Sequence, residues 1–334
     1  MYYLESQGTP WEIGMNHGTR LRNEIAQAYR DWKIEDRRQD KETQEMASRM
    51  RKYLEDNLPD LIEEMSGIAE AADLPFEKVF WLTCFNSMRF TLEECSAMVV
   101  RNANGGAVIG KTHDIDVVEQ RYVLVHKIVE KDAIPRINIS SVGSLWSYGG
   151  VNAGGIAFGT TSTPPVSKHD GRGMPQHISG FHALKHCRTV DEVIDEMSQT
   201  TFAGKGLNMV FGDAQGGAAA IEKVSTLQSV EKTSDSPVFR TNHYLDKKME
   251  AAVGAKANSG ENSRQRYERL SEILMPGRFD DAVAKLKGVV SDTTEPGALC
   301  RASTLSAWVL DPKASVAWIC PTNPEPEGFV CFKI

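Results

Sequence analysis

Cys95 stands where a helical pattern gives way to short apolar runs, and two ionisable residues follow it closely. The run 96–100 and the next one are separated by the segment 102–106 (NANGG), which predicts a hairpin turn. A hairpin would bring Lys111 and Asp114, at the end of the second run, back beside Cys95. A thiol next to a cationic group ionises more readily and becomes a nucleophile. The spacing makes Cys95 a candidate for thiolate chemistry, with a packed core cysteine as the alternative.

A histidine is the usual proton acceptor for a catalytic cysteine, but the sequence does not select one. The candidates are His113, His126, His177, His182, His186 and His243. His182 and His186 have i, i+4 spacing on a helical pattern, which can bind a metal ion, yet no glutamate stands beside the first histidine as in HExxH. A solvated or core helix face explains this pair better, so we expect no metal site.

Three further segments carry groups that can stabilise a negative charge. The turn 149–156 (GGVNAGGI) lacks the Lys-Ser/Thr of a P-loop and the GxGxxG spacing, so it does not indicate phosphate binding. Its backbone N–H groups near Asn152 can bind an oxyanion, or the segment is a plain β-turn. Asn242 can donate an amide hydrogen bond, although asparagine is also common in turns. Arg301 begins a strand-like run, and its guanidinium can orient an acid or a substrate carboxylate.

The elements that must position these residues fall into a helical front and a strand-rich remainder. Apolar residues at i, i+3 and i+4 predict helices. These helices cover 11–31, 41–57, 59–72, 76–88, 177–199 and 261–288. Short apolar runs bounded by turns predict strands. These strands cover 96–100, 107–110, 122–130, 136–142, 155–160, 206–212, 217–223, 226–231, 302–310 and 314–320.

Short strands joined by turns favour antiparallel sheets over βαβ crossovers. We therefore expect an α+β fold in which two packed sheets are covered by helices on both sides. The loop 163–177 is rich in proline, glycine and charge, and it is a candidate cover for the site.

The composition is that of an ordinary globular protein of 334 residues, with 41% hydrophobic and 25% charged residues. This length fits one large domain or two average ones. The formal net charge of −7 and the absence of a basic stripe argue against nucleic-acid binding. The dense mixed charge of 33–64 is typical of solvated helix faces.

Neither a signal peptide nor a transmembrane segment is indicated. The start MYYLESQGTPWEIG has no basic region and no apolar core, and no run of about 18 apolar residues occurs. The six cysteines form no CxxC pair and no dense disulfide framework. We expect reduced thiols in a cytoplasmic protein that binds neither membranes nor nucleic acid.

Seven segments, in the correct order along nearly the whole chain, resemble the acyl-coenzyme A:isopenicillin N acyltransferase family of self-cleaving cysteine amidases. The chain is more distantly similar to penicillin V acylase and bile-salt hydrolase. The segments are 8–14 with 17–18, 58–73, 94–97, 110–114, 150–155, 241–243 and 299–301.

This resemblance implies a four-layer αββα sandwich of the N-terminal-nucleophile type with antiparallel sheets. It also implies a precursor that cuts itself between Glu94 and Cys95. The products would be a helical α-chain segment, 1–94, and a catalytic segment, 95–334, which together form one domain. The freed α-amino group of Cys95 would then be the base for its own thiol, which explains why no histidine stands out.

The resemblance also assigns roles to the other candidates. It implies that Asp114 holds the Cys95 amine, that Asn242 and the backbone near Asn152 form the oxyanion hole, and that Arg301 orients the nucleophile.

The chain departs from the family pattern at three places. Glu94 stands where some members have glycine, Thr112 replaces an asparagine, and Lys111 fills the place of an arginine in bile-salt hydrolases. Because these changes bear on the substrate, Lys111, His113 and His243 are candidates for substrate contact or site support.

The function that follows is a cysteine amidase hydrolysing a linear C–N bond of a small N-acyl amino compound or peptide-like amide through a Cys95 thioester. One alternative is an acyltransferase that passes an acyl group from coenzyme A or an amide to an amine. The other is an uncut, non-catalytic binding protein. No cofactor is implied, and the expected partners are a small amide or acyl substrate and the chain's own two fragments. A homo-oligomer stays open.

Overall fold

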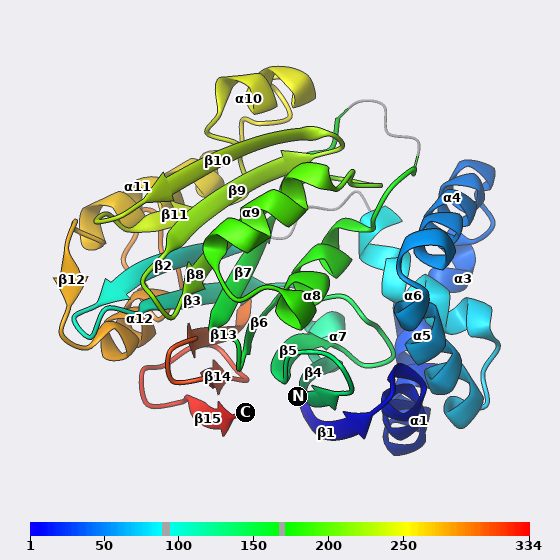
Figure 1. Ribbon diagram of the computed structural model, residues 1–334. Helices are drawn as coiled ribbons and strands as arrows, with labels where there is room; N and C mark the ends of the chain where they lie inside the picture. Colours follow the sequence, from blue (N-terminus) through cyan, green and yellow to red (C-terminus); the bar gives the residue numbers. More distant parts are fainter. Residues whose placement is uncertain (89–93, 167–170) are drawn as a thin grey trace.

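The computed structural model describes residues 1–88, 94–166 and 171–334. Part of the loop 163–177, the candidate cover for the site, therefore lies outside the described residues. Two β-sheets face each other in the centre of the molecule, and the helices lie around them (Figure 1).

Within the described residues, one sheet has eight strands. In spatial order they are β1 (Tyr2–Gly8), β4 (Val123–Glu130), β5 (Arg136–Ser141), β6 (Gly149–Asn152), β7 (Ile156–Ser162), β8 (Leu207–Asp213), β9 (Ala218–Val224) and β10 (Leu227–Thr233). Neighbouring strands are antiparallel except β1 and β4, which are parallel.

The described part of the second sheet has seven strands. In spatial order they are β11 (Val238–Arg240), β2 (Ser96–Asn102), β3 (Ala107–Asp114), β13 (Thr304–Asp311), β14 (Val316–Cys320) and β15 (Val330–Lys333), with β12 (Arg278–Phe279) paired to β2. The predicted hairpin after Cys95 is the β2–β3 pair, in which Ser96 lies opposite Thr112. Its turn contains Gly105 at φ +91°, a conformation that glycine adopts at little cost.

The two sheets are in direct contact where the candidate site lies. A Cβ atom added to Gly159 of β7 would lie 3.4 Å from the Lys111 Cβ and 3.5 Å from the Ala97 Cβ. Because glycine has no side chain, β7 can pack closely on β2 and β3 at this point. Lys111 and Ala97 therefore face the eight-stranded sheet.

Helices cover both outer faces of the sheet pair. Helices α8 (Gln176–His186) and α9 (Val190–Gln199) pack on the eight-stranded sheet, where Leu184 and Val193 join Phe158 and Phe211 in one apolar cluster. Helices α11 (Glu261–Ile273) and α12 (Ala282–Val290) pack on the other sheet through a separate cluster that includes Leu286. Figure 1 shows the two helix pairs on opposite sides of the sheets. The predicted αββα sandwich is confirmed.

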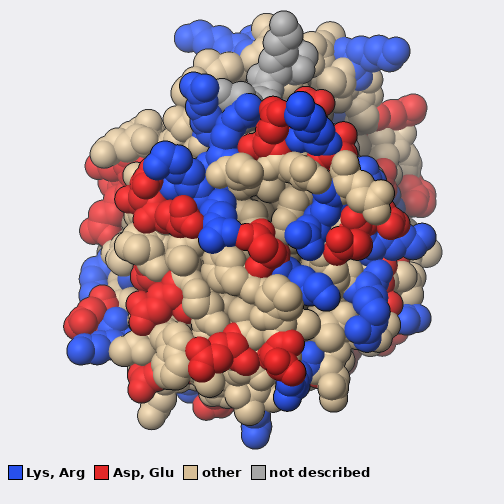
Figure 2. Space-filling view, turned by 90° about the vertical axis from the view of Figure 1, so that its right-hand side faces the viewer, with Lys and Arg blue, Asp and Glu red and all other residues tan. Residues whose placement is uncertain are grey.

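The N-terminal helices form a layer beside the sandwich, at the right of Figure 1. They are α1 (Pro10–Arg20), α2 (Arg22–Asp31), α3 (Ile34–Arg37), α4 (Lys41–Asn57), α5 (Pro59–Ala72) and α6 (Phe76–Met88). Thr9 caps α1 in a capping box with Glu12. The helix predicted over 11–31 is interrupted at Leu21, which ends α1. On the face that these helices build, acidic and basic side chains are interspersed (Figure 2), as the mixed charge of 33–64 predicts.

The sequence suggested that the segment before Cys95 is helical throughout, but the structure also contains a strand there. Strand β1 lies at the edge of the eight-stranded sheet, with Leu4 opposite His126 of β4. The short helices α7 (Val117–Gln120) and α10 (Lys247–Val253) lie in connections between strands. No helix in the described part of the chain is long and apolar enough to span a membrane.

A buried charge network joins α5, the eight-stranded sheet and α8. Lys185 forms ion pairs with Asp60 and with Glu130, the latter at 2.6 Å. Arg136 also pairs with Glu130. Glu64 is fully buried beside them, and burial raises the pKa of its carboxyl to about 8. The network thus spans three layers of the molecule.

Candidate active site

Cys95 lies directly before β2 and is almost completely buried, with 1% of its surface exposed. The next residue is anchored to the neighbouring strand, because the Ser96 N–H donates to the Thr112 Oγ1 at 3.0 Å. Lys111 of β3 places its Nζ 3.6 Å from the Cys95 Sγ. The expected approach of Lys111 to the thiol is therefore present in the structure.

The Lys111 amino group lies between aromatic rings. Its Nζ is 4.4 Å from the ring centroid of Trp308 and 5.7 Å from that of Tyr148. The whole residue is buried. Aromatic faces attract a cation, more strongly where water is excluded.

Arg301 connects Glu94 to Asp114. Its Nη1 donates to the Glu94 Oε2 at 2.7 Å, and its Nη2 donates to the Glu94 carbonyl oxygen at 3.1 Å and to the Asp114 Oδ2. The contacted carbonyl belongs to the peptide bond between residues 94 and 95. Arg301 therefore holds the residue before the candidate nucleophile, whereas the resemblance implied that it orients the nucleophile itself.

Asp114 ends β3 as a buried carboxylate. Burial raises the pKa of its carboxyl, and the Arg301 guanidinium opposes this shift. The Thr304 hydroxyl lies close enough to help lower the pKa, but the Oδ1 atom has no partner at hydrogen-bonding distance among the described residues. A buried carboxylate oxygen of this kind is suited to accept a hydrogen bond from a cationic group.

Arg266 of α11 was not singled out by the sequence, yet it is the arginine that contacts Cys95. Its Nη1 donates to the Cys95 carbonyl oxygen and, at 2.9 Å, to the Ser96 Oγ. Its Nη2 donates to the Asn242 Oδ1 at 2.8 Å, and its Nε to the Asn262 Oδ1 at 2.8 Å. Burial lowers the pKa of this guanidinium to about 10, opposed by the charge of Asp114.

Little in the amino-acid sequence indicates this position of Arg266. Arg266 stands in a charged helical pattern with Arg264 and Arg269 nearby, and its i, i+4 spacing to Asn262 resembles an ordinary solvated face. The Arg266 side chain points toward Cys95 because of how α11 packs on the sheet.

Asn242 is held in one orientation by its neighbours. Its Oδ1 accepts from Arg266, its Nδ2 donates to the Ser162 carbonyl oxygen at 2.9 Å, and its backbone N–H donates to the Ser263 Oγ at 2.8 Å. The first two turns of α11 therefore hold both Asn242 and Cys95, through Ser263 and Arg266.

The two candidate histidines, His243 and His113, are buried and have lowered pKa values. The Nδ1 of His243 lies 2.7 Å from the Ser263 Oγ, and burial, followed by nearby arginines, lowers the pKa of this imidazole to about 4. His113 packs on Tyr148, with ring centroids 4.2 Å apart. Its pKa lies well below the usual value because of burial and then the charge of Lys111. Both rings are therefore neutral near pH 7, and their part in substrate contact or site support stays a prediction.

The Asn152 side chain is hydrogen-bonded to backbone groups of α8 and of its own turn. Its Nδ2 donates to the carbonyl oxygens of Leu184 and Cys187, both at 2.9 Å, and its Oδ1 accepts from the Ile156 N–H. The side chain thus closes the turn between β6 and β7 on the face that carries α8, away from the second sheet. The side-chain amide is therefore engaged by its own turn and by α8, and the oxyanion role of the backbone near Asn152 stays a prediction.

The rings of His182 and His186 lie against each other, with centroids 4.6 Å apart, and His182 contacts helix α9. The His182 Nδ1 lies 2.9 Å from the Glu196 Oε1 of α9. Among residues 1–88, 94–166 and 171–334, no group of three or more His, Cys, Asp or Glu side chains could hold a metal ion.

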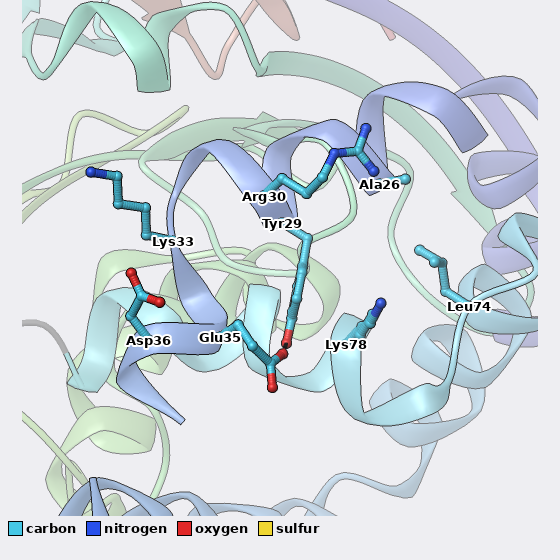
Figure 3. Close-up of a pocket in the computed structure, with 8 residues that line it drawn as sticks. All are labelled: Ala26, Tyr29, Arg30, Lys33, Glu35, Asp36, Leu74 and Lys78. Carbon is cyan, nitrogen blue, oxygen red and sulfur yellow. Dashed lines mark hydrogen bonds between the residues drawn. The ribbon is translucent and has the colours of Figure 1, made fainter. Parts of the chain in front are cut away.

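A hollow on the N-terminal helices is lined by charged side chains of both signs (Figure 3). Inside it, the Tyr29 hydroxyl donates to the Glu35 Oε2 at 2.6 Å, and the Lys78 Nζ lies 5.1 Å from the Tyr29 ring centroid. These groups satisfy one another, and they belong to α2, α3 and α6, whereas Cys95 precedes β2. The hollow is therefore separate from the candidate active site.

A family model described as acyl-coenzyme A:6-aminopenicillanic acid acyl-transferase matches residues 100–326, which is more than half of the chain. The chain belongs to this acyl-transferase family. The family resemblance indicated by the sequence motifs is confirmed, and the protein is a member of a family of enzymes. The matched part of the chain contains Lys111, Asp114, Asn242 and Arg301.

A curated relative from Emericella nidulans is the acyl-coenzyme A:6-aminopenicillanic-acid-acyltransferase 40 kDa form. It is 25% identical over 355 residues, and the alignment covers 99% of this acyl-transferase family member and 96% of the relative. The likeness therefore extends over both chains from end to end.

Solved structures give more distant likenesses. An N-acylethanolamine-hydrolyzing acid amidase ortholog from Caenorhabditis elegans has a TM-score of 0.49 and 14% identity over 66% of this chain and 93% of that one. Penicillin V acylase from Agrobacterium tumefaciens has a TM-score of 0.47 and 14% identity over 67% of this chain and 82% of that one. A conjugated bile acid hydrolase from Clostridium perfringens has a TM-score of 0.43 and 9% identity over 72% of this chain and 92% of that one.

Proposed function

We propose that the chain cuts itself between Glu94 and Cys95 and then hydrolyses a linear C–N amide bond of a small N-acyl amino compound or peptide-like amide. The observation that supports this proposal most is the contact of Arg301 with the Glu94 carbonyl oxygen, one residue before a buried thiol that lies beside a lysine. A thiol and a peptide carbonyl with a cationic donor are the groups that such a cut requires, and the buried carboxylate of Asp114 is suited to hold the amine that the cut frees.

In the cut itself, the Cys95 sulfur attacks the carbonyl carbon of Glu94. Negative charge develops on the carbonyl oxygen, to which the Arg301 Nη2 already donates. A positively charged donor placed at the oxygen stabilises the transition state more than the ground state. The Glu94–Cys95 C–N bond then breaks, a thioester joins residue 94 to the sulfur, and water releases the carboxylate and the thiol.

The cut frees the α-amino group of Cys95, whose pKa in peptides is about 7.7–8.0. This amine becomes the base that removes the thiol proton, and the Asp114 Oδ1, which has no hydrogen bond among the described residues, is suited to hold it. The thiolate attacks the substrate carbonyl, the amine leaves, and a thioester forms that water hydrolyses. Asn242, oriented by Arg266, is the proposed donor to the oxygen of the substrate carbonyl.

Replacement of the nucleophile tests the proposal directly. Cys95→Ala is expected to abolish both self-cleavage and turnover of N-acyl amino acids or short peptide-like amides, because no other group forms the thioester. Mass spectrometry of the purified wild-type chain should give one fragment of 94 residues and one of 240, the remainder of 334.

The matched control is Cys187→Ala, which removes a buried thiol near α9 and leaves the site unchanged. A Cys95→Ala chain that is still cut or still active would refute the proposal. A wild-type chain that stays intact and inactive would point instead to an uncut binding protein.

The second candidate function is acyl transfer to an amine, with the same thioester. It is favoured by the curated relative from Emericella nidulans, whose name is that of an acyltransferase. Incubation with an acyl donor, with and without an added amine such as 6-aminopenicillanic acid, separates the two functions. An N-acylated amine as the main product indicates the transferase, and a free acid indicates the amidase.

A further inference from the structure

We propose that Lys111 carries the proton of self-cleavage: its amine takes the proton of the Cys95 thiol and delivers it to the amine that leaves. This inference rests on the proposed cut before Cys95. It answers a need that the cut creates, because in the uncut chain the nitrogen of Cys95 belongs to a peptide bond and cannot act as a base.

The geometry that supports this role is the contact between Lys111 and the thiol. The Nζ lies 3.6 Å from the Sγ, within hydrogen-bonding reach for a sulfur atom. Lys111 forms no ion pair with a carboxylate of the described residues, and its other close neighbours are the rings of Trp308 and Tyr148. A buried ammonium without a counter-charge is costly, so the Lys111 amine is suited to take a proton here only as the Cys95 sulfur gives one up.

The other ionisable groups around Lys111 do not fit the same role. His113 and His177 lie next to Tyr148, and the pKa of His113 is lowered so far that this imidazole is neutral and weakly basic. The Tyr148 ring lies 5.7 Å from the Nζ. Arg266 and Arg301 are engaged with backbone and carboxylate oxygens, and a guanidinium does not give up its proton in proteins.

The proton balance is complete without an external acid or base. The neutral Lys111 amine accepts the S–H proton, and the sulfur bonds to the Glu94 carbonyl carbon. When the C–N bond breaks, the Lys111 ammonium donates that same proton to the Cys95 nitrogen. The step ends with a thioester, a free α-amine on Cys95 and a neutral Lys111, and water later hydrolyses the thioester.

This division of work distinguishes the first cut from later turnover. Once the α-amine of Cys95 is free, it takes over as the base, and Lys111 keeps only an electrostatic effect on the thiolate. A change at Lys111 should therefore slow the cut much more than it slows turnover by chains that have been cut.

The test compares Lys111→Arg with Lys223→Arg. Arginine keeps the positive charge but does not exchange its proton, so Lys111→Arg is expected to slow self-cleavage by about 10²-fold or more, the range of general acid–base catalysis. Lys223→Arg changes another buried lysine, whose Nζ lies 5.4 Å from the Phe202 ring and 3.3 Å from the Gln228 Oε1, and should cleave at the wild-type rate. Pulse-chase labelling during cell-free synthesis of the full chain gives the first-order rates.

Long incubation of Lys111→Arg yields cut protein, whose turnover per cut chain is expected to fall by a smaller factor than the cleavage rate. Cleavage of Lys111→Arg within threefold of wild type would overturn the proposal, as would equal losses in cleavage and turnover. A wild-type chain that never cuts would instead remove the proposed function itself.

A second measurement needs no variant. The cleavage rate of the wild-type chain should follow a bell-shaped pH profile, because the Cys95–Lys111 pair must have lost one proton and kept the other. A rate that only rises with pH would overturn the proposal, because the leaving amine would then need no proton from Lys111.

Discussion

Two guanidinium groups hold the two residues that flank the proposed cut. Arg301 donates to the carbonyl oxygen of Glu94, and Arg266 donates to that of Cys95. Only Arg266 also fixes the Asn242 amide. After the proposed cut, therefore, Arg266 would stay with Cys95 and the proposed oxyanion donor, while Arg301 would stay between Asp114 and the new end of the first fragment.

This difference predicts the effect of Arg266→Lys. A lysine keeps the charge but cannot bridge Cys95, Ser96 and Asn242 with one planar fork, so both reacting groups lose their alignment. Such misplacement is expected to lower kcat about 10²-fold, with a smaller change in KM, in steady-state assays of the cut enzyme. Arg264→Lys, a more exposed arginine of the same helix, should leave kcat within threefold of wild type; an equal loss in both variants would contradict the role given to Arg266.

The sequence predicted which residues of the β2–β3 hairpin lie near Cys95. It did not predict the residues that distant segments of the chain place there. The turn at 102–106 was sufficient to place Lys111 beside Cys95, because hairpin register follows from the turn. Arg266 could not be predicted, because its inward direction depends on how α11 packs. The partners of the Asn152 side chain could not be predicted for a similar reason: the sequence shows an amide in a glycine-rich turn but not the carbonyl oxygens of α8 that occupy it.

Helices α1 and α5 meet through glycines, which bring their backbones unusually close. A Cβ atom added to Gly67 would lie 2.4 Å from the Trp11 carbonyl oxygen, and one added to Gly14 would lie 2.1 Å from that of Glu64. Backbone atoms cannot move aside as a flexible side chain can. The contact therefore requires glycine on both helices.

Gly67→Ala is accordingly expected to destabilise the protein by about 1–3 kcal/mol, the usual cost of overpacking a tight contact. Urea unfolding monitored by circular dichroism measures it. Gly288→Ala in α12 is the control, since no atom lies within 4 Å of the added Cβ, and it should be neutral or stabilising by up to about 1 kcal/mol. A Gly67→Ala chain as stable as Gly288→Ala would show that α1 can shift without cost.

Most elements were predictable because local signals were strong. Helices α4, α5 and α6 match the predicted ranges, since their apolar spacing, Pro59 and the Asp40 cap act within a few residues. Strand β1 was missed, because YYLESQG is half polar and its partner β4 lies more than a hundred residues away. Strand β6 was taken for a turn because of its two glycines, which the close packing against Trp308 and Leu184 requires.

The charge network between α5, the eight-stranded sheet and α8 joins distant parts of the molecule. It contains three carboxylates and two cationic side chains. Asp60 and Glu130 take part in ion pairs with Lys185 and Arg136, whereas neither carboxylate oxygen of Glu64 has a partner among the described residues. A surplus carboxylate in a buried site binds a proton. This is the physical reason for the pKa of about 8 at Glu64.

The sign of the pH effect follows from that shift. The folded chain binds the Glu64 proton more tightly than the unfolded chain, so the resulting stability is fully present below about pH 4.5 and is lost as the pH rises through about 8. Glu64→Gln cannot ionise. Its free energy of unfolding, relative to wild type, is expected to rise by up to about 1.4 kcal/mol per pH unit between these values.

Urea unfolding at pH 5, 7 and 9 measures this difference. Glu63→Gln, an exposed neighbour on α5, should show no such trend. A pH-independent difference for Glu64→Gln would mean that Glu64 is ionised in the folded protein.

The contact between Glu94 and Arg301 spans 207 residues of sequence. During synthesis, Glu94 and Cys95 leave the ribosome long before Arg301 is made. A growing chain therefore lacks the Arg301 guanidinium at the Glu94 carbonyl oxygen. The same holds for a chain that ends early, or for one whose last third does not pack on the sheet. Maturation would thus report that translation is complete and folding correct, so that a reactive N-terminal cysteine is released only in a finished molecule.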